Sequence, residues 1–125
     1  MFKLKKLNKF QKFDLAAFLK GKKLEVANIS EHRKYVDGQP GDVDGVSIKV
    51  AIVSDPTDYG QPGVSNLYQM FTVRINGARL DDVVGMMKPG DSVQLVQYVK
   101  ASIYGQFRDQ LSVQVSSIND LKVLK

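Results

Sequence analysis

The sequence has no cysteine, no tryptophan and a single histidine among its 125 residues. Without cysteine the fold cannot depend on disulfides, and thiolate metal sites and cysteine nucleophiles are excluded. No apolar run approaches the roughly 18 residues that a membrane-spanning helix requires. Lysines interrupt the N-terminus, where a secretory signal would be continuously apolar. These absences lead us to expect a cytoplasmic protein without membrane contact.

Motifs of common phosphate-binding and metal-dependent enzymes are missing as well. The chain contains neither a Gly-x-x-x-x-Gly-Lys-Ser/Thr loop nor a Gly-x-Gly-x-x-Gly run. Residues 42–45 (DVDG) have the start of a calcium loop, but Val53 stands where an EF-hand needs glutamate. His32 has no second histidine to join it in a metal site, and we interpret it as a surface side chain. We therefore expect no catalytic residues, no metal and no cofactor.

The charge is unevenly distributed along the chain. The sequence holds 18 basic and 13 acidic residues, and eight of its lysines but only one aspartate lie within residues 1–23. Such a basic segment attracts polyanions. We separate residues 1–22 as a basic N-terminal extension that either wraps a DNA backbone or packs on the protein or a second subunit. Packing is favoured for its large apolar side chains, Leu7, Phe10, Phe13 and Phe18, with the lysines left free for phosphate.

Hydrophobic periodicity predicts the secondary structure of the remainder, residues 23–125. Alternating apolar residues predict strands at 23–36, 46–54, 67–75, 92–104 and 111–115. Within the fourth of these, Val93, Leu95, Val99, Ala101 and Ile103 are expected to face inward. Helical spacing from Leu80 to Met87 places a helix between the third and fourth strands. A second short helix is expected over Leu15–Lys20, with Asp14 as its cap and Gly21 as its stop.

Two segments rich in glycine, proline and aspartate, 37–45 and 55–66, are predicted to be loops. The resulting order of elements is typical of an all-β fold with one short helix. It favours a five-stranded Greek-key barrel of the oligonucleotide-binding type (OB-fold) over residues 23–125. Closing the sheet into a barrel removes the exposed edges of such short strands.

Several segments resemble a known family. FTVRING (71–77), a short helix ending in MMKPGDSV (86–93), the hairpin YGQFR (104–108) and the strand LSVQV (111–115) are similar to single-stranded DNA-binding proteins of bacteria and their phages. Asn76 replaces a tryptophan common in the bacterial members, and Gln97 stands near an expected glycine. No glycine-rich linker or acidic C-terminal tip follows, so the resemblance implies a tailless phage or mobile-element type. It also implies a homo-oligomer, a dimer or tetramer, that assists replication or recombination.

Binding a single strand requires cations that neutralise phosphates and flat rings that stack on bases. The outward faces and ends of the predicted strands supply both kinds of side chain. The candidate binding residues are Tyr35, Lys49, Tyr68, Arg74, Tyr98, Lys100, Tyr104, Phe107 and Arg108. Tyr59, in the second predicted loop, is a further candidate ring.

Each of these side chains has a second interpretation, because outward aromatics on strands also pack across the sheet or against a subunit. The function predicted from the sequence is binding of single-stranded DNA without strong sequence preference, which protects the strand during replication or recombination. The alternative is a protein-interaction module of a replication or conjugation complex, built on the same barrel. A small nuclease that uses the clustered aspartates is a third interpretation.

Overall fold

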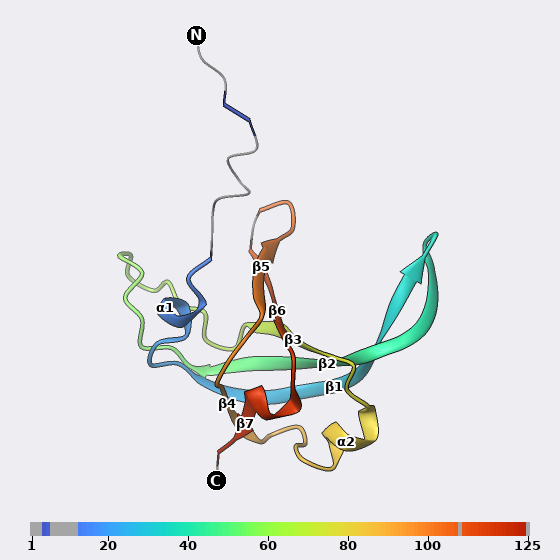
Figure 1. Cartoon of the computed structure of the whole chain (residues 1–125). Coiled ribbons are helices and arrows are strands. Elements are labelled where there is room, and N and C mark those ends of the chain that lie inside the picture. The colour runs from blue at the N-terminus through green and yellow to red at the C-terminus, as the bar shows by residue number, and fades with distance from the viewer. Residues whose placement is uncertain (1–3, 6–12, 108, 125) are drawn as a thin grey trace.

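Figure 1 shows the computed structural model of the chain, which describes residues 4–5, 13–107 and 109–124. The described residues form two short helices and one 3-10 turn, α1 (Leu15–Leu19), α2 (Leu80–Val84) and η2 (Ile118–Asp120). The strands are β1 (Lys23–Val36), β2 (Gln39–Ser54), β3 (Met70–Asn76), β4 (Ser92–Leu95), β5 (Lys100–Tyr104), β6 (Gln110–Val115) and β7 (Leu121–Val123). Within the described residues, no helix has both the length and the apolarity to cross a bilayer.

The strands form one sheet that curls into a half-barrel, in the order β5-β6-β3-β2-β1-β4-β7. Neighbouring strands are antiparallel except β3 and β6, which run parallel. The mostly-β prediction is therefore confirmed, and α2 lies between β3 and β4 as expected. The predicted strand 92–104 is divided into β4 and β5, and β7 was not predicted.

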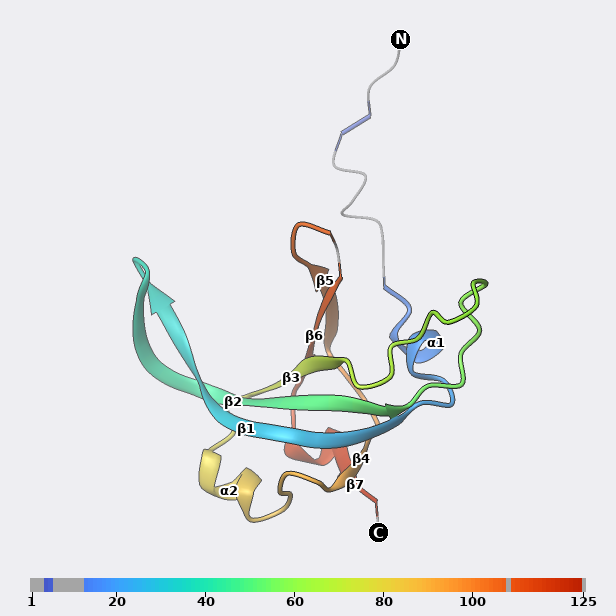
Figure 2. The same ribbon diagram turned by 180° about the vertical axis from the view of Figure 1, so that it is seen from behind.

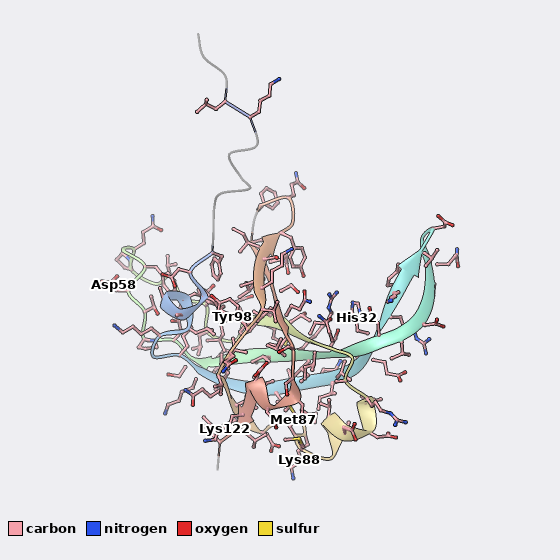
Figure 3. The ribbon with its side chains drawn as sticks, in the orientation of Figure 1. His32, Asp58, Met87, Lys88, Tyr98 and Lys122 are labelled. Carbon is pink, nitrogen blue, oxygen red and sulfur yellow. The ribbon has the colours of Figure 1, made fainter. Side chains whose placement is uncertain are left out.

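Alternation along β2 and β3 builds the core. Val46, Ile48, Val50 and Ile52 are all buried, and on β3 the buried residues are Phe71, Val73 and Ile75. They face Val83 of α2 and Met87 beyond it, which are buried in the same cluster. Figure 3 places Met87 below the ribbon of β1 and β2 and His32 above it. One face of this sheet is thus apolar and covered, and the other is open to solvent.

The predicted loop 37–45 is wrong, because β1 and β2 continue as one long hairpin that turns only at Asp37 and Gly38. Both residues have positive φ, 51° and 78°, as a type I′ hairpin turn requires. Pro40 is tolerated because β2 pairs with β3 only from Gly45 onward, so the proline interrupts no ladder on that side. Glycine is needed at position 45, where β2 begins to pair with β3, since an added Cβ would lie 2.3 Å from the carbonyl oxygen of Ile75.

Gly38→Ala is expected to lower the free energy of unfolding by about 1 kcal/mol, because a side chain disfavours the left-handed backbone conformation. The cost comes from backbone strain alone, since an added Cβ at this position would meet no atom within 4 Å. Asp37→Asn is the control, because asparagine adopts this conformation readily and leaves the stability unchanged or raised. Urea denaturation of the two variants checks the expectation. A Gly38→Ala protein as stable as the wild type would contradict it.

The predicted inward direction is wrong for Val99, which is 62% exposed. The chain leaves the ladder after β4, which pairs with β1 and β7, and enters it again at β5, which pairs with β6. Val99 lies in the segment between these strands. Ile103 pairs with Leu111 and shares the inward face of Ala101, although it is 37% exposed near the end of β5. Val93, Leu95 and Ala101 do pack in or against the core.

The helix predicted over Leu15–Lys20 is confirmed as α1, and the Asp14 carboxylate accepts a hydrogen bond from the Ala17 N–H at 3.0 Å. Leu15 is buried in the core, and Phe13 and Phe18 pack against it as expected. Leu7 and Phe10 lie outside the described residues. The domain boundary at residue 22 stays a prediction.

Candidate nucleic-acid interface

Three projections rise from the open side of the sheet. They are the β1–β2 hairpin, the β5–β6 hairpin, and the segment 55–69 together with α1 (Figures 1 and 2). The two views, related by a half turn, agree that α2, β4 and β7 lie on the opposite side. The projections therefore frame the solvent-facing surface of the central strands.

Cross-strand pairing places the candidate cations on this surface in two parallel rows. Paired residues on neighbouring strands face the same way, so each row can be followed from β1 to β5. The first row is Ser30, Ser47, Arg74, Gln114 and Lys100. The second row is Asn28, Lys49, Thr72, Ser112 and Ser102. We call these ten residues the polar face.

The polar face carries three cations and no carboxylate. Lys49 and Lys100 are exposed, and Arg74 is half-buried at the centre of its row. Each row crosses five strands, which corresponds to about 19 Å at the usual strand spacing. The sequence thus placed Lys49, Arg74 and Lys100 correctly on outward strand positions, and the fold brings them to one surface.

The predicted rings border this surface to different degrees. Tyr104 follows Ser102 at the next outward position of β5. Phe107 lies in the β5–β6 turn, Tyr35 near the β1–β2 tip and Tyr68 just before β3, with exposed fractions of 77%, 73% and 72%. Tyr68 was predicted within a strand but lies in a turn with φ 67°, an uncommon conformation for a residue with a side chain. The Tyr68 N–H donates a hydrogen bond to the Ile52 carbonyl oxygen, with an N···O distance of 2.7 Å.

Two candidates are not placed on the polar face. Arg108 lies outside the described residues. Tyr98 follows β4 and lines a groove of about 660 Å³ whose walls include Leu15 and Leu19 of α1 and Val93 of β4. This groove lies between α1 and the β4 edge of the sheet, so Tyr98 lies outside the two rows of the polar face, two residues before Lys100.

A search of protein-family models, curated proteins and solved structures returned no match to this chain. The resemblance to single-stranded DNA-binding proteins stays a prediction.

His32, interpreted from the sequence as a surface side chain, is half-buried and bonded at the edge of the polar face. Its Nδ1 lies 2.5 Å from Oδ1 of Asp44, and its Nε2 lies 3.4 Å from a terminal nitrogen of Arg74. The Arg74 Nε also donates to the Asn76 side-chain oxygen at 3.0 Å. The hydrogen bond from His32 lowers the pKa of Asp44, with the positive charges of Arg74 and Lys34 adding to the effect. In the sequence, the feature that could have predicted the His32–Asp44 contact is the Asp37-Gly38 dipeptide. It favours a tight hairpin turn, and such a turn brings His32 and Asp44 together across the hairpin.

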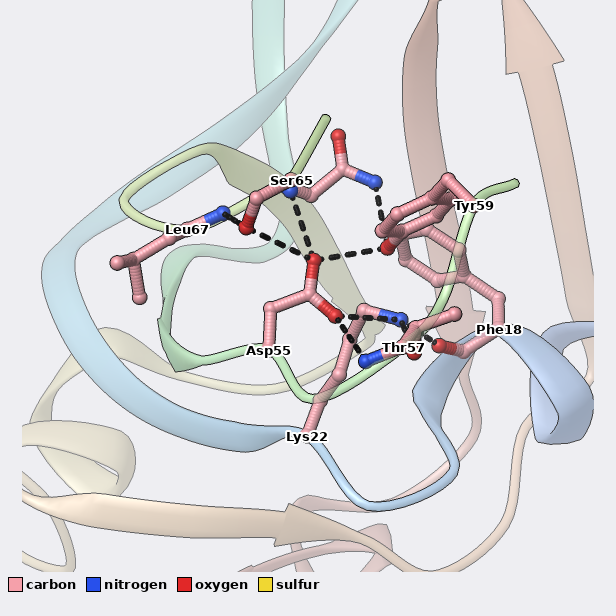
Figure 4. A network of polar contacts seen from close by, with 8 residues as sticks. Phe18, Lys22, Asp55, Thr57, Tyr59, Ser65 and Leu67 are labelled. Carbon is pink, nitrogen blue, oxygen red and sulfur yellow. Dashed lines mark hydrogen bonds and ion pairs between the residues drawn. The ribbon is translucent and has the colours of Figure 1, made fainter. Parts of the chain in front are cut away.

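A second polar network, shown in Figure 4, ties α1 to the segment after β2. The Lys22 ammonium lies 3.3 Å from Oδ1 of Asp55, and neither side chain has any exposed surface. The ammonium also donates to the Thr57 hydroxyl at 2.9 Å and to the Phe18 carbonyl, and it lies 4.4 Å from the centre of the Phe18 ring. The N-terminal extension is therefore anchored at its last residue.

The Asp55 carboxylate also accepts hydrogen bonds from residues of its own loop. Its Oδ2 accepts from the Asn66 N–H at 2.7 Å and from the Tyr59 hydroxyl at 2.8 Å, and Oδ1 accepts from the Thr57 N–H at 3.2 Å. Burial alone would raise the pKa of Asp55, but these bonds and the Lys22 ammonium hold it well below its ordinary value. Tyr59 is thus bonded inside the loop, where the sequence had suggested a ring for nucleic acid.

Proposed function

We propose that the chain is an OB-fold protein that binds single-stranded DNA through the polar face and the rings that border it. Lysine and arginine neutralise phosphates, and exposed rings stack on bases without reading their edges. Because no base-specific contact is required, the sequence preference is weak. Coating of this kind protects a strand during replication or recombination.

The strand order supports the OB-type barrel. Residues 92–104 pair with β1 through β4 and with β6 through β5, so one segment joins the two ends of the run β1-β2-β3-β6. Five segments would then enclose the core: β1, β2, β3, the 92–104 segment and β6. The parallel pairing of β3 with β6 and the place of α2 after β3 fit the same scheme.

The observation that carries the proposal is that the ten residues of the polar face include Lys49, Arg74 and Lys100 but no carboxylate, and that Asp44 at its edge is bonded to His32. Two hairpins rise beside this surface, and Phe107 and Tyr35 are exposed on them. An exposed phenylalanine at a hairpin turn contributes nothing to the core, whereas a base stacked on it would gain about 1–3 kcal/mol. The charge and the rings are the two components that strand binding needs.

The proposal is tested by fluorescence anisotropy with labelled oligo-dT, a duplex and an RNA strand at two salt concentrations. We expect the affinity for oligo-dT to exceed that for the duplex and to fall as salt rises, because neutralised phosphates release counterions. Absence of oligo-dT binding at the lower salt concentration would reject the function.

Phe107→Ala is expected to weaken oligo-dT binding about tenfold, because one stacking contact is lost. Phe107→Tyr is the matched control, since it keeps a flat ring at the same position and should bind like the wild type. The anisotropy titration measures both, and the unfolding midpoint of Phe107→Ala should not change. Equal affinity of the alanine and tyrosine variants would remove Phe107 from the interface.

A protein contact is the second candidate, and the groove beside α1 favours it. Val96, Tyr98 and Val99 are exposed near this groove, with fractions of 54%, 43% and 62%. Exposed apolar side chains that cluster in this way are typical of interfaces. Sedimentation analysis tests whether the chain forms the dimer or tetramer that the family resemblance implies. Tyr98→Ala should then shift the assembly toward the monomer, and if Tyr98 instead contacts DNA it should weaken oligo-dT binding.

A further inference from the structure

The central cation of the polar face is held by a titratable side chain. Arg74 lies on β3, His32 on β1 and Asp44 on β2, and the imidazole bridges the other two. An arginine has only donors, so the contact at 3.4 Å requires His32 Nε2 to be an unprotonated acceptor. The proton of the neutral ring then lies on Nδ1, directed at the Asp44 carboxylate 2.5 Å away.

A second proton on His32 changes both contacts. The Nδ1 bond to Asp44 becomes an ion pair, but Nε2–H turns into a donor that faces the donors of Arg74. Two like charges at this distance repel each other, so the guanidinium is driven away from the ring. The cluster also changes from neutral to a net charge of one positive unit, since Asp44 and Arg74 balance each other.

We propose that His32 and Asp44 are positioning residues for Arg74, and that protonation of His32 releases Arg74 and raises the affinity of the polar face for phosphate. This inference rests on the proposed function. Histidine is the side chain that ordinarily titrates between pH 5 and 8, so the test compares two pH values near the ends of this range. The lowered pKa of Asp44 keeps its carboxylate charged throughout.

Other charged side chains near this cluster lie on β1. Lys34 contributes a positive field at Asp44. Glu31 and Arg33, the neighbours of His32, pair with each other at 3.7 Å. His32 is the sole histidine of the chain, so a pH response that is lost in His32→Gln can be assigned to it.

The test compares the wild type with His32→Gln in oligo-dT titrations. Glutamine can donate to Asp44 and accept from Arg74 but carries no charge at any pH, and it therefore fixes the neutral arrangement. For the wild type we expect about fivefold tighter binding at pH 5.5 than at pH 8 in 0.1 M salt, with a salt slope steeper by about 0.7. His32→Gln should bind equally at both pH values, and a pH response equal to that of the wild type would overturn the inference.

A second measurement does not need DNA. The imidazole of His32 gives a single set of NMR signals, whose titration can be followed in the wild type and in Arg74→Gln. Removing the repelling guanidinium should raise the apparent pKa of the ring, and identical titrations would overturn the inference. Loss of oligo-dT binding at every pH, together with the expected NMR shift, would reject the proposed function and leave the His32–Arg74 coupling intact.

Discussion

The triple variant Lys49→Gln, Arg74→Gln, Lys100→Gln is expected to bind oligo-dT about 100-fold more weakly than the wild type at 0.1 M salt. Each phosphate neutralised on a single strand contributes about 0.7 to the slope of log affinity against log salt, so the slope should fall by about 2. Anisotropy titrations over a range of salt concentrations measure both quantities. Lys49 and Lys100 are exposed, so their loss should change stability little, and the cost of the triple variant should come from the contacts of Arg74 with Asn76 and His32.

The matched control is Arg79→Gln, Lys88→Gln, Lys122→Gln. It removes the same kinds and number of charges, but from the side of the sheet that carries α2 and β7 (Figure 3). The control variant should keep most of the affinity, since phosphates would lie on the opposite side of the molecule. Equal weakening in both triple variants would show that only net charge matters, and the polar face would then not be the binding surface.

Much of the fold could be predicted because apolar alternation and burial coincide in β2 and β3. Val46 to Ile52 and Phe71 to Ile75 are buried at every second position, as their pattern indicates. The helix α1 was predictable from its cap, Asp14, because a carboxylate that bonds the first turn is a local signal. Local patterns of this kind survive in the fold because tertiary packing acts in the same direction.

The predictions failed where pairing partners outweighed local composition. Residues 37–45 contain the residues of a loop, but only Asp37 and Gly38 turn, and the others extend β2. Val99 was expected to face inward in a regular strand, but the strand breaks between Leu95 and Lys100 and Val99 is exposed there. No single-sequence pattern reports which neighbour a strand pairs with, and that pairing decides both outcomes.

The candidate site, too, could be predicted where local patterns decide the structure and not where strand pairing or loop contacts decide it. Outward positions for Lys49, Arg74 and Lys100 could be read from alternation, whereas their common surface depends on the register of β1, β2, β3, β6 and β5. The contacts of His32 with Arg74 and of Asp55 with Lys22 were missed because each joins residues distant along the chain. The bond from Tyr59 to Asp55 is local, but composition alone does not show how a loop folds, and the ring was expected to be free.

The Lys22–Asp55 pair matters for the site because it holds α1 and the segment 55–69 together beside the sheet (Figure 4). This segment is one of the three projections that frame the polar face. A fully buried charge is stabilising only while its partner and hydrogen bonds are in place. A single substitution in this pair should therefore have a large effect on stability.

Asp55→Ala is expected to lower the free energy of unfolding by about 3–5 kcal/mol, because it leaves the Lys22 ammonium buried without its counter-charge. The N–H groups of Asn66 and Thr57 lose their acceptor in the same step. Urea denaturation measures the loss. Asp58→Ala is the control within the same loop, since Asp58 is exposed and, among the described residues, accepts a hydrogen bond only from the Gly60 N–H at 2.8 Å. It should cost about 1 kcal/mol or less.

A double-mutant cycle separates the ion pair from the rest of the network. Lys22→Met with Asp55→Ala should cost less than the sum of the two single variants, because the double variant leaves no unpaired buried charge. If the costs added, the two side chains would not be coupled, and the loss in Asp55→Ala would come from the loop hydrogen bonds alone.

Acid should weaken the same network. The pKa of Asp55 is held below its ordinary value in the folded protein, so between the two values the unfolded chain binds more protons than the folded one. The contribution of the carboxylate is therefore complete above the unfolded value of about 3.9 and is lost as the pH falls from there toward the folded value. The stability advantage of the wild type over Asp55→Asn should be constant from about pH 5 to pH 7 and smaller at about pH 3. An advantage that stayed constant down to the lower pH would mean that the carboxylate gains nothing from Lys22 and the loop N–H groups.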